Sequence, residues 1–251
     1  MNYTEKLEEL YKRVYPCSRF SECSKNGKNC VPGCGHKFYK AKLGKDYGKA
    51  DGTKIMFVGK EATDDCGDMS LYSIEEPSDI ATCPHNNYHY FKTIYTAAIL
   101  ANKTPRAPDR KDLLEFGNLR HSFCLTNFYK CAFKVNTNNH NIKTNPAMSK
   151  SCGTILLREI EVLQPDIIVI QGKFTNRLFW NGLETLSQKR FGKDLWKSNS
   201  CKISVSQYKY NNGKEFCVIW SYHPCAFGNK WEKTLDEFEK ALHVAKQQFI
   251  I

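Results

Sequence analysis

Short apolar runs alternate with segments of helical periodicity in this chain. Residues 54–58 and 166–171 read as strands, and the second run is apolar almost throughout, which is typical of a parallel strand covered on both faces. A third strand ends at Asn127, and apolar residues recur at helical spacing from Cys152 to Leu163. This alternation predicts an α/β fold: a three-layer α/β/α sandwich around a short central, mainly parallel sheet.

Helices are expected on both faces of that sheet. The first is predicted over residues 4–14, with Thr4 as its cap. Ser149 is the expected cap of the helix that Cys152 opens. A last helix is expected over residues 231–249.

Two further segments have a clear reading. Residues 202–209 and 216–222 are expected to form a hairpin, because Asn211-Asn212-Gly213 between them is a strong turn signal. The segment 66–89 holds two prolines and many polar residues, which predicts a long irregular insertion. Loops of that length are usually functional or mobile.

The carboxyl ends of the predicted strands carry the candidate chemistry. Asn127 and Gly172 end two of them, and open α/β sheets bind their ligands at this edge. The first strand runs into Gly59, which is followed by the carboxylates of Glu61, Asp64 and Asp65. We therefore expect Asn127 to read a base or substrate, although an asparagine after a strand also forms ordinary turns.

Charge narrows the class of partner. The chain has 251 residues and a formal net charge of +11, which with its many aromatic residues favours nucleic acid over a membrane. No apolar run approaches the roughly 20 residues of a membrane helix, and the N-terminus lacks a secretory apolar core. We expect one intracellular (cytoplasmic) domain over residues 1–251.

The twelve cysteines need their own explanation. Disulfides are disfavoured in a reducing compartment, so a metal or cluster accounts better for a subset of the thiols. Cys17, Cys23, Cys30 and Cys34 lie close together and could bind zinc by themselves as a small structural knuckle.

Four motifs in order carry a family resemblance. They are Cys30 with Cys34, the segment Thr126-Asn127 followed by Cys131, then Cys152 before the strand that ends at Gly172, and last Tyr222-His223-Pro224. Over nearly its whole length the chain resembles the iron–sulfur uracil-DNA glycosylases, called family 4 of the uracil-DNA glycosylase superfamily. The resemblance implies the same sandwich fold, with the N-terminal helix and Cys-rich segment (1–50) attached through a metal cluster.

The chain departs from the family at its first motif. Where the family has Gly-Glu-Ala-Pro-Gly, this chain has Gly59-Lys60-Glu61-Ala62-Thr63. The longer insertion 66–89 replaces a short segment that supplies a stacking aromatic, a role open here to Tyr88, Tyr90 or Phe91. The first cysteine pair is also spaced Cys-x3-Cys rather than Cys-x2-Cys. These changes affect which base the pocket is expected to accept more than they affect the expected fold.

The resemblance assigns roles for base excision, which requires a flipped base and donors aimed at its developing negative charge. Asn127 would read the base edge, with Gly59 and Tyr90 beside it. His223 would donate to the base carbonyl, although a His-Pro pair is often only a turn. One of the carboxylates Glu61, Asp64 and Asp65 would orient water.

The loop after His223 would contact DNA. Phe227 would fill the gap that the flipped base leaves, and Lys230 would meet phosphate, with Pro224 at the turn. An ordinary loop with one exposed aromatic is the alternative.

Four thiolates complete the set that the resemblance implies. Cys30, Cys34, Cys131 and Cys152 would hold an iron–sulfur cluster of the [4Fe–4S] type with a structural role. Four thiolates would equally hold zinc.

The expected function is that of a monomeric, monofunctional DNA glycosylase that excises uracil or another modified pyrimidine from DNA. A version specialised for a bulky modified cytosine in foreign (phage) DNA is the first alternative. The others are a non-catalytic nucleic-acid-binding module and a zinc-stabilised interaction domain.

Overall fold

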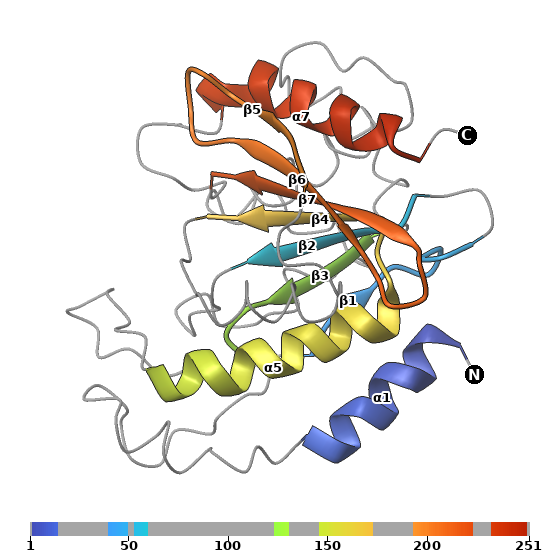
Figure 1. The fold of residues 1–251 in the computed structure, drawn as a ribbon. Coiled ribbons are helices and arrows are strands. Elements are labelled where there is room, and N and C mark those ends of the chain that lie inside the picture. The colour runs from blue at the N-terminus through green and yellow to red at the C-terminus, as the bar shows by residue number, and fades with distance from the viewer. Residues whose placement is uncertain are drawn as a thin grey trace, which may run out of the picture.

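A computed structural model describes residues 2–14, 40–49, 53–59, 123–130, 146–172, 193–222 and 232–249 of the chain (Figure 1). In order along the chain, the elements are α1 (Tyr3–Val14), β1 (Lys42–Leu43), β2 (Ile55–Gly59), β3 (Phe123–Asn127), α5 (Pro146–Leu163), β4 (Ile167–Gln171), β5 (Lys193–Lys197), β6 (Ser204–Lys209), β7 (Glu215–Ser221), the 3₁₀ helix η4 (Glu232–Thr234) and α7 (Leu235–Gln247).

The strands form one mixed sheet in the order β1-β3-β2-β4-β7-β6-β5. The central strands β3, β2, β4 and β7 are parallel, while β1, β6 and β5 pair antiparallel with their neighbours at the two sides. Every residue of β2 and β4 is buried, as expected for parallel strands covered on both faces. The predicted α/β fold with a parallel centre is confirmed.

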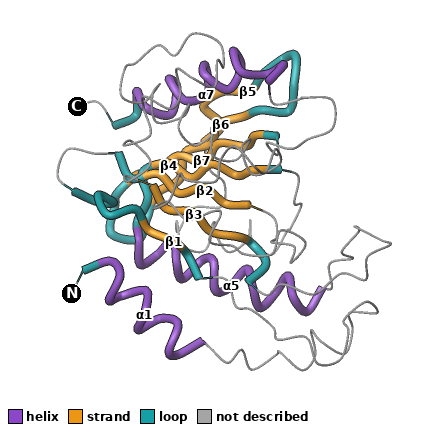
Figure 2. Tube along the Cα trace, turned by 180° about the vertical axis from the view of Figure 1, so that it is seen from behind, coloured by secondary structure: helices purple, strands orange, loops and turns teal. Residues whose placement is uncertain are grey.

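Helices cover both faces of this sheet (Figures 1 and 2). Met56 and Val58 of β2 pack in the core beneath α5 and α1, whereas Ile55 and Phe57 pack on the side of α7. This division follows from the pleat, since successive side chains of a strand point to opposite faces. The sandwich therefore has α1 and α5 on one side and α7 on the other.

Two predicted helix caps are wrong. The backbone N–H of Glu5 donates to Asn2 Oδ1 and that of Asn2 donates to Glu5 Oε2, both at 2.9 Å, so Asn2 rather than Thr4 caps α1 in a reciprocal capping box. Helix α5 begins at Pro146, because proline is favoured at a first helical position, and Ser149 therefore lies inside it. Cys152 consequently lies in the second turn of α5 and does not open it.

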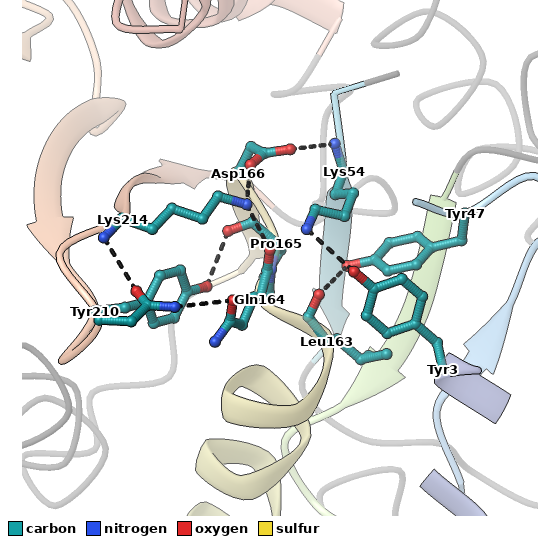
Figure 3. Close-up of polar contacts among 10 residues, drawn as sticks. Tyr3, Tyr47, Lys54, Leu163, Gln164, Pro165, Asp166, Tyr210 and Lys214 are labelled. Carbon is teal, nitrogen blue, oxygen red and sulfur yellow. Dashed lines mark hydrogen bonds and ion pairs between the residues drawn. The ribbon is translucent and has the colours of Figure 1, made fainter. Parts of the chain in front are cut away.

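A polar cluster closes the amino-terminal end of the parallel strands (Figure 3). Asp166 precedes β4 and accepts a hydrogen bond from the backbone N–H of Lys54 at 2.6 Å, while its other oxygen pairs with Lys214 Nζ at 2.5 Å. Lys214 Nζ also donates to the carbonyl of Gln164, which has a φ of 44° in the turn between α5 and β4. These contacts fix the entry to β2 and β4, at the end opposite to Asn127.

Among the residues that the structure describes, no helix has the length and apolar character needed to cross a bilayer.

Candidate functional site

Three of the predicted site residues belong to the described part of the chain, namely Gly59, Asn127 and Cys152. The remaining ones lie outside it: Cys30, Cys34, Glu61, Asp64, Asp65, Tyr90, Cys131, His223, Pro224, Phe227 and Lys230. The insertion predicted over residues 66–89 also lies outside the described residues.

Gly59 and Asn127 face each other at the carboxyl ends of β2 and β3. They are partners in the parallel register, and the N–H of Phe128 donates to the carbonyl of Gly59 at 2.8 Å. A β-carbon on Gly59 would lie only 2.5 Å from Asn127 Oδ1, far inside van der Waals contact. The absence of a side chain at position 59 therefore makes room for the amide of Asn127.

The carboxyl ends of β4 and β7 are locked to each other at the same edge. Gly172, with a φ of 105°, donates its N–H to the carbonyl of Ser221 at 2.9 Å, and Ser221 Oγ donates to the carbonyl of Ile170 at 3.0 Å. A positive φ of this size is readily adopted only by glycine. Tyr222 follows directly, and its hydroxyl accepts a hydrogen bond from the N–H of Lys202 at 3.2 Å. The strand order thus brings Gly59, Asn127 and Tyr222 to one edge.

A buried polar network lies directly behind Asn127. Lys130 Nζ and Glu159 Oε2 are 2.5 Å apart, and both side chains are 0% exposed. Thr126 Oγ1 donates to the same carboxylate oxygen at 2.8 Å, and Tyr11 OH donates to Glu159 Oε1 at 2.6 Å. We call Tyr11, Thr126, Lys130 and Glu159 the buried tetrad.

Burial and the charge of Glu159 raise the pKa values of two neutral groups in and beside the tetrad. Burial, and then the negative charge of Glu159, raise the pKa of the Tyr11 phenol far above its ordinary value. Burial likewise raises the pKa of the Cys124 thiol; Glu159 adds to this effect and Lys130 opposes it. Tyr11 and Cys124 therefore stay neutral beside the ion pair of Lys130 and Glu159.

Sequence reasoning missed this network. A lysine after a strand normally lies in solvent, and nothing local indicates that Lys130 is buried. One signal was available. Glu159 interrupts the apolar stripe of α5 between Leu156 and Leu163, and an acidic residue in such a stripe requires a buried partner.

Cys152 is the predicted metal ligand that can be placed. Its side chain is buried, and its Sγ accepts a hydrogen bond from the N–H of Lys130 at 3.4 Å. Lys130 precedes Cys131 in the chain, so Cys152 lies beside the segment that carries another predicted ligand. A backbone donor at sulfur suits a thiolate. Within the described ranges, no three His, Cys, Asp or Glu side chains come together as a metal site.

Comparison with protein-family models identifies the family of the chain. The family model of the uracil DNA glycosylase superfamily matches residues 45–246, which is most of the chain. Comparison with the curated proteins found no match. The matched span contains the whole sheet apart from β1, together with Gly59, Asn127 and Cys152. The chain belongs to the uracil DNA glycosylase superfamily.

Proposed function

We propose that this protein is a monofunctional DNA glycosylase of the iron–sulfur type, which flips a modified pyrimidine out of DNA and hydrolyses its N-glycosidic bond. Members of its superfamily are in general DNA glycosylases that act on uracil-like bases. The observation that carries the proposal is the placement of the Asn127 amide over Gly59 at the carboxyl edge of the sheet. The net charge of +11 suits a polyanionic substrate.

Asn127 has the chemistry that base reading requires. A flipped pyrimidine presents donors and acceptors along one edge, and a carboxamide offers both kinds of group. The Asn127 side chain is half-buried, and the packing against Gly59 limits where its Oδ1 can lie. A pre-set amide loses less entropy on binding than a mobile one, which favours the flipped base.

The bond-breaking step would use groups that follow β2 and β7 in the chain. The leaving base carries developing negative charge, which a donor from His223 would stabilise. A water held by Glu61, Asp64 or Asp65 would attack the cation-like sugar. The segments after Gly59 and after Tyr222 both continue directly from the carboxyl ends of parallel strands, the end of the sheet where Asn127 lies. Phe227 would occupy the gap in the duplex.

The proposed cofactor is a [4Fe–4S] cluster on Cys30, Cys34, Cys131 and Cys152. It would be structural, tying the N-terminal segment to the strand that carries Asn127. The fit rests on Cys152, whose buried Sγ accepts the N–H of the residue before Cys131. Zinc is the alternative that four thiolates also permit.

The first motif favours a second candidate substrate. Thr63 replaces the proline that the family has after Glu-Ala, and the segment 66–89 is longer than its counterpart. Both changes fall on the expected pocket wall. A wider pocket would accept a bulky modified cytosine, and such an activity serves defence against foreign DNA rather than repair.

The test is base release by protein purified without oxygen, on uracil and on bulky modified-cytosine substrates, each as duplex and single strand. Release that is abolished in Asn127→Ala supports the proposed function, and the substrate released decides between the two candidates. Iron and zinc would be counted in the same sample. A protein that binds all these DNAs and releases nothing from any of them is a binding module, and the proposal then fails.

A further inference from the structure

We propose that the buried tetrad is a positioning device, which sets the orientation of Asn127 and holds it in register with the cysteine site. The inference rests on the proposed function and adds to it a role for Tyr11, Thr126, Lys130 and Glu159, none of which would touch the base.

The ion pair contributes geometry more than stability. Lys130 and Glu159 are both 0% exposed, so the desolvation of two charges offsets most of their attraction. An apolar pair of similar volume would stabilise the core as well or better. Glu159, however, accepts three hydrogen bonds in fixed directions, from Tyr11, Thr126 and Lys130. Hydrogen bonds of this kind specify where their donors lie.

Two of those donors flank Asn127. Thr126 precedes it and Lys130 follows it by three residues, and both reach the same oxygen of Glu159. Between them, Phe128 is fixed by its N–H bond to Gly59 and by complete burial. The segment 126–130 is therefore held at both ends and in the middle. The position of the Asn127 side chain is set by this fixed backbone.

The same segment contacts the cysteine site. The N–H of Lys130 bonds Cys152 Sγ, while its Nζ bonds Glu159. Cys152 and Glu159 are seven residues apart on α5, which is two turns, so they lie on the same helix face. One residue, Lys130, thus joins the proposed ligand to the tetrad through both its backbone and its side chain.

Tyr11 connects Glu159 to the residues on both sides of the Cys-rich segment. Its hydroxyl donates to Glu159 Oε1 and accepts the N–H of Ala41, each at 2.6 Å. Tyr11 lies near the end of α1, before the segment that holds Cys30 and Cys34, and Ala41 lies after that segment. Both flanks therefore converge on one phenol oxygen, and through Glu159 on the strand end of Asn127.

The experiment compares wild type with Glu159→Gln and with the charge-free double variant Lys130→Met/Glu159→Gln. Glu161→Gln is the matched control, because Glu161 lies on the same helix in an exposed pair with Arg158. Three quantities are measured: the single-turnover rate of base release, the thermal unfolding temperature, and hydrogen–deuterium exchange of residues 123–130. Exchange of residues 204–221, in β6 and β7, reports global stability in the same samples.

If the tetrad is a positioning device, the double variant keeps its unfolding temperature and its exchange in β6 and β7, because no unpaired charge is left buried in its core. Residues 123–130 nevertheless exchange about tenfold faster. The release rate falls about 10- to 100-fold, with unchanged affinity for undamaged duplex. Glu161→Gln matches wild type throughout.

Unchanged exchange of residues 123–130 in the double variant overturns the inference, as does a wild-type release rate in it. A wild-type protein that releases no base from any substrate refutes the proposed function instead. The exchange comparison then still decides whether the tetrad orders the segment that carries Asn127.

Discussion

Asn127 Oδ1 occupies the space that a β-carbon on Gly59 would fill, 2.5 Å from that carbon's ideal position. The two residues are register partners at the carboxyl ends of β2 and β3. The glycine and the amide therefore form one packing unit at the edge where open α/β sheets bind ligands.

Gly59→Ala is expected to displace the amide while the fold persists. The clashing atom is the end of a rotatable side chain, so Asn127 can turn away and the sheet need not open. A displacement of about 1 Å at a reading group lowers kcat/KM by about 100-fold. Steady-state release of the base, together with thermal unfolding, measures both effects.

Gly153→Ala is the matched control for that substitution. Its β-carbon would meet the Phe128 ring at 3.5 Å, an ordinary contact, and an alanine inside a helix is about 1 kcal/mol more favourable than glycine. Wild-type activity with equal or higher stability is expected. Equal activity in Gly59→Ala and Gly153→Ala would contradict a role for the Gly59–Asn127 packing.

Cys152→Ala is expected to remove the bound metal, whereas Cys217→Ala retains it. Both thiols are buried, but Cys152 is the one whose Sγ lies beside the segment of Cys131. Cys217 lies on the opposite face of the sheet from Cys152, packed against α7, and burial raises the pKa of its thiol to about 12. Metal per chain, counted after anaerobic purification, separates the two. Equal metal in both variants would exclude Cys152 as a ligand.

Asp166→Asn is expected to lower stability without affecting the chemistry. It removes the charged partner of Lys214, which keeps its bond to the carbonyl of Gln164, and a partly buried, charge-assisted pair of this kind contributes about 1–2 kcal/mol to the free energy of unfolding. Asp166 lies about 15 Å from the Asn127 edge, the length of a five-residue strand. Denaturant unfolding and kcat/KM measure the two quantities.

Lys209→Met serves as the control for Asp166→Asn, because its pair with Glu215 is exposed and 3.9 Å apart. A change within about 0.5 kcal/mol is expected there. A large loss of activity in Asp166→Asn at a temperature where it stays folded would show that the amino-terminal edge also takes part in function.

Alkaline pH is expected to unfold the protein cooperatively. Burial raises the pKa of Tyr11, Tyr47 and Tyr210 above the ordinary value of 10. The folded state therefore binds these protons more tightly than the unfolded state. Its advantage is complete below about pH 10 and is lost as the pH rises further. Phenolate absorbance and circular dichroism should change together; gradual ionisation with native dichroism would contradict this.

The central strands could be predicted because their signal is local. Every side chain of β2 and β4 is buried, so a continuous apolar run marks them in the sequence. β5 was missed for the opposite reason. It is an edge strand with lysines at both ends, and Lys193 and Lys197 are exposed. Charged edges of this kind prevent pairing with other chains and hide the strand's periodicity.

The candidate site was predictable only where one strand end defines it. Asn127 follows a recognisable strand, and its placement at the carboxyl edge is as expected. The burial of Lys130 instead depends on Glu159, 29 residues away, and on Tyr11. No sequence periodicity links those positions, so the sequence alone does not indicate the ion pair. The helix caps were missed because Thr4 and Ser149 were plausible by residue type alone.

The bond from Tyr11 to Glu159 joins residues 148 positions apart in the chain. A ribosome adds about 5–20 residues per second, so the phenol is made roughly 7 to 30 seconds before its carboxylate partner. During that interval neither α5, on which α1 packs, nor the carboxylate of Glu159 has yet been made. Helix α1 therefore cannot dock until α5 has also been synthesised, and the network behind Asn127 is completed only after Glu159 has been added to the chain.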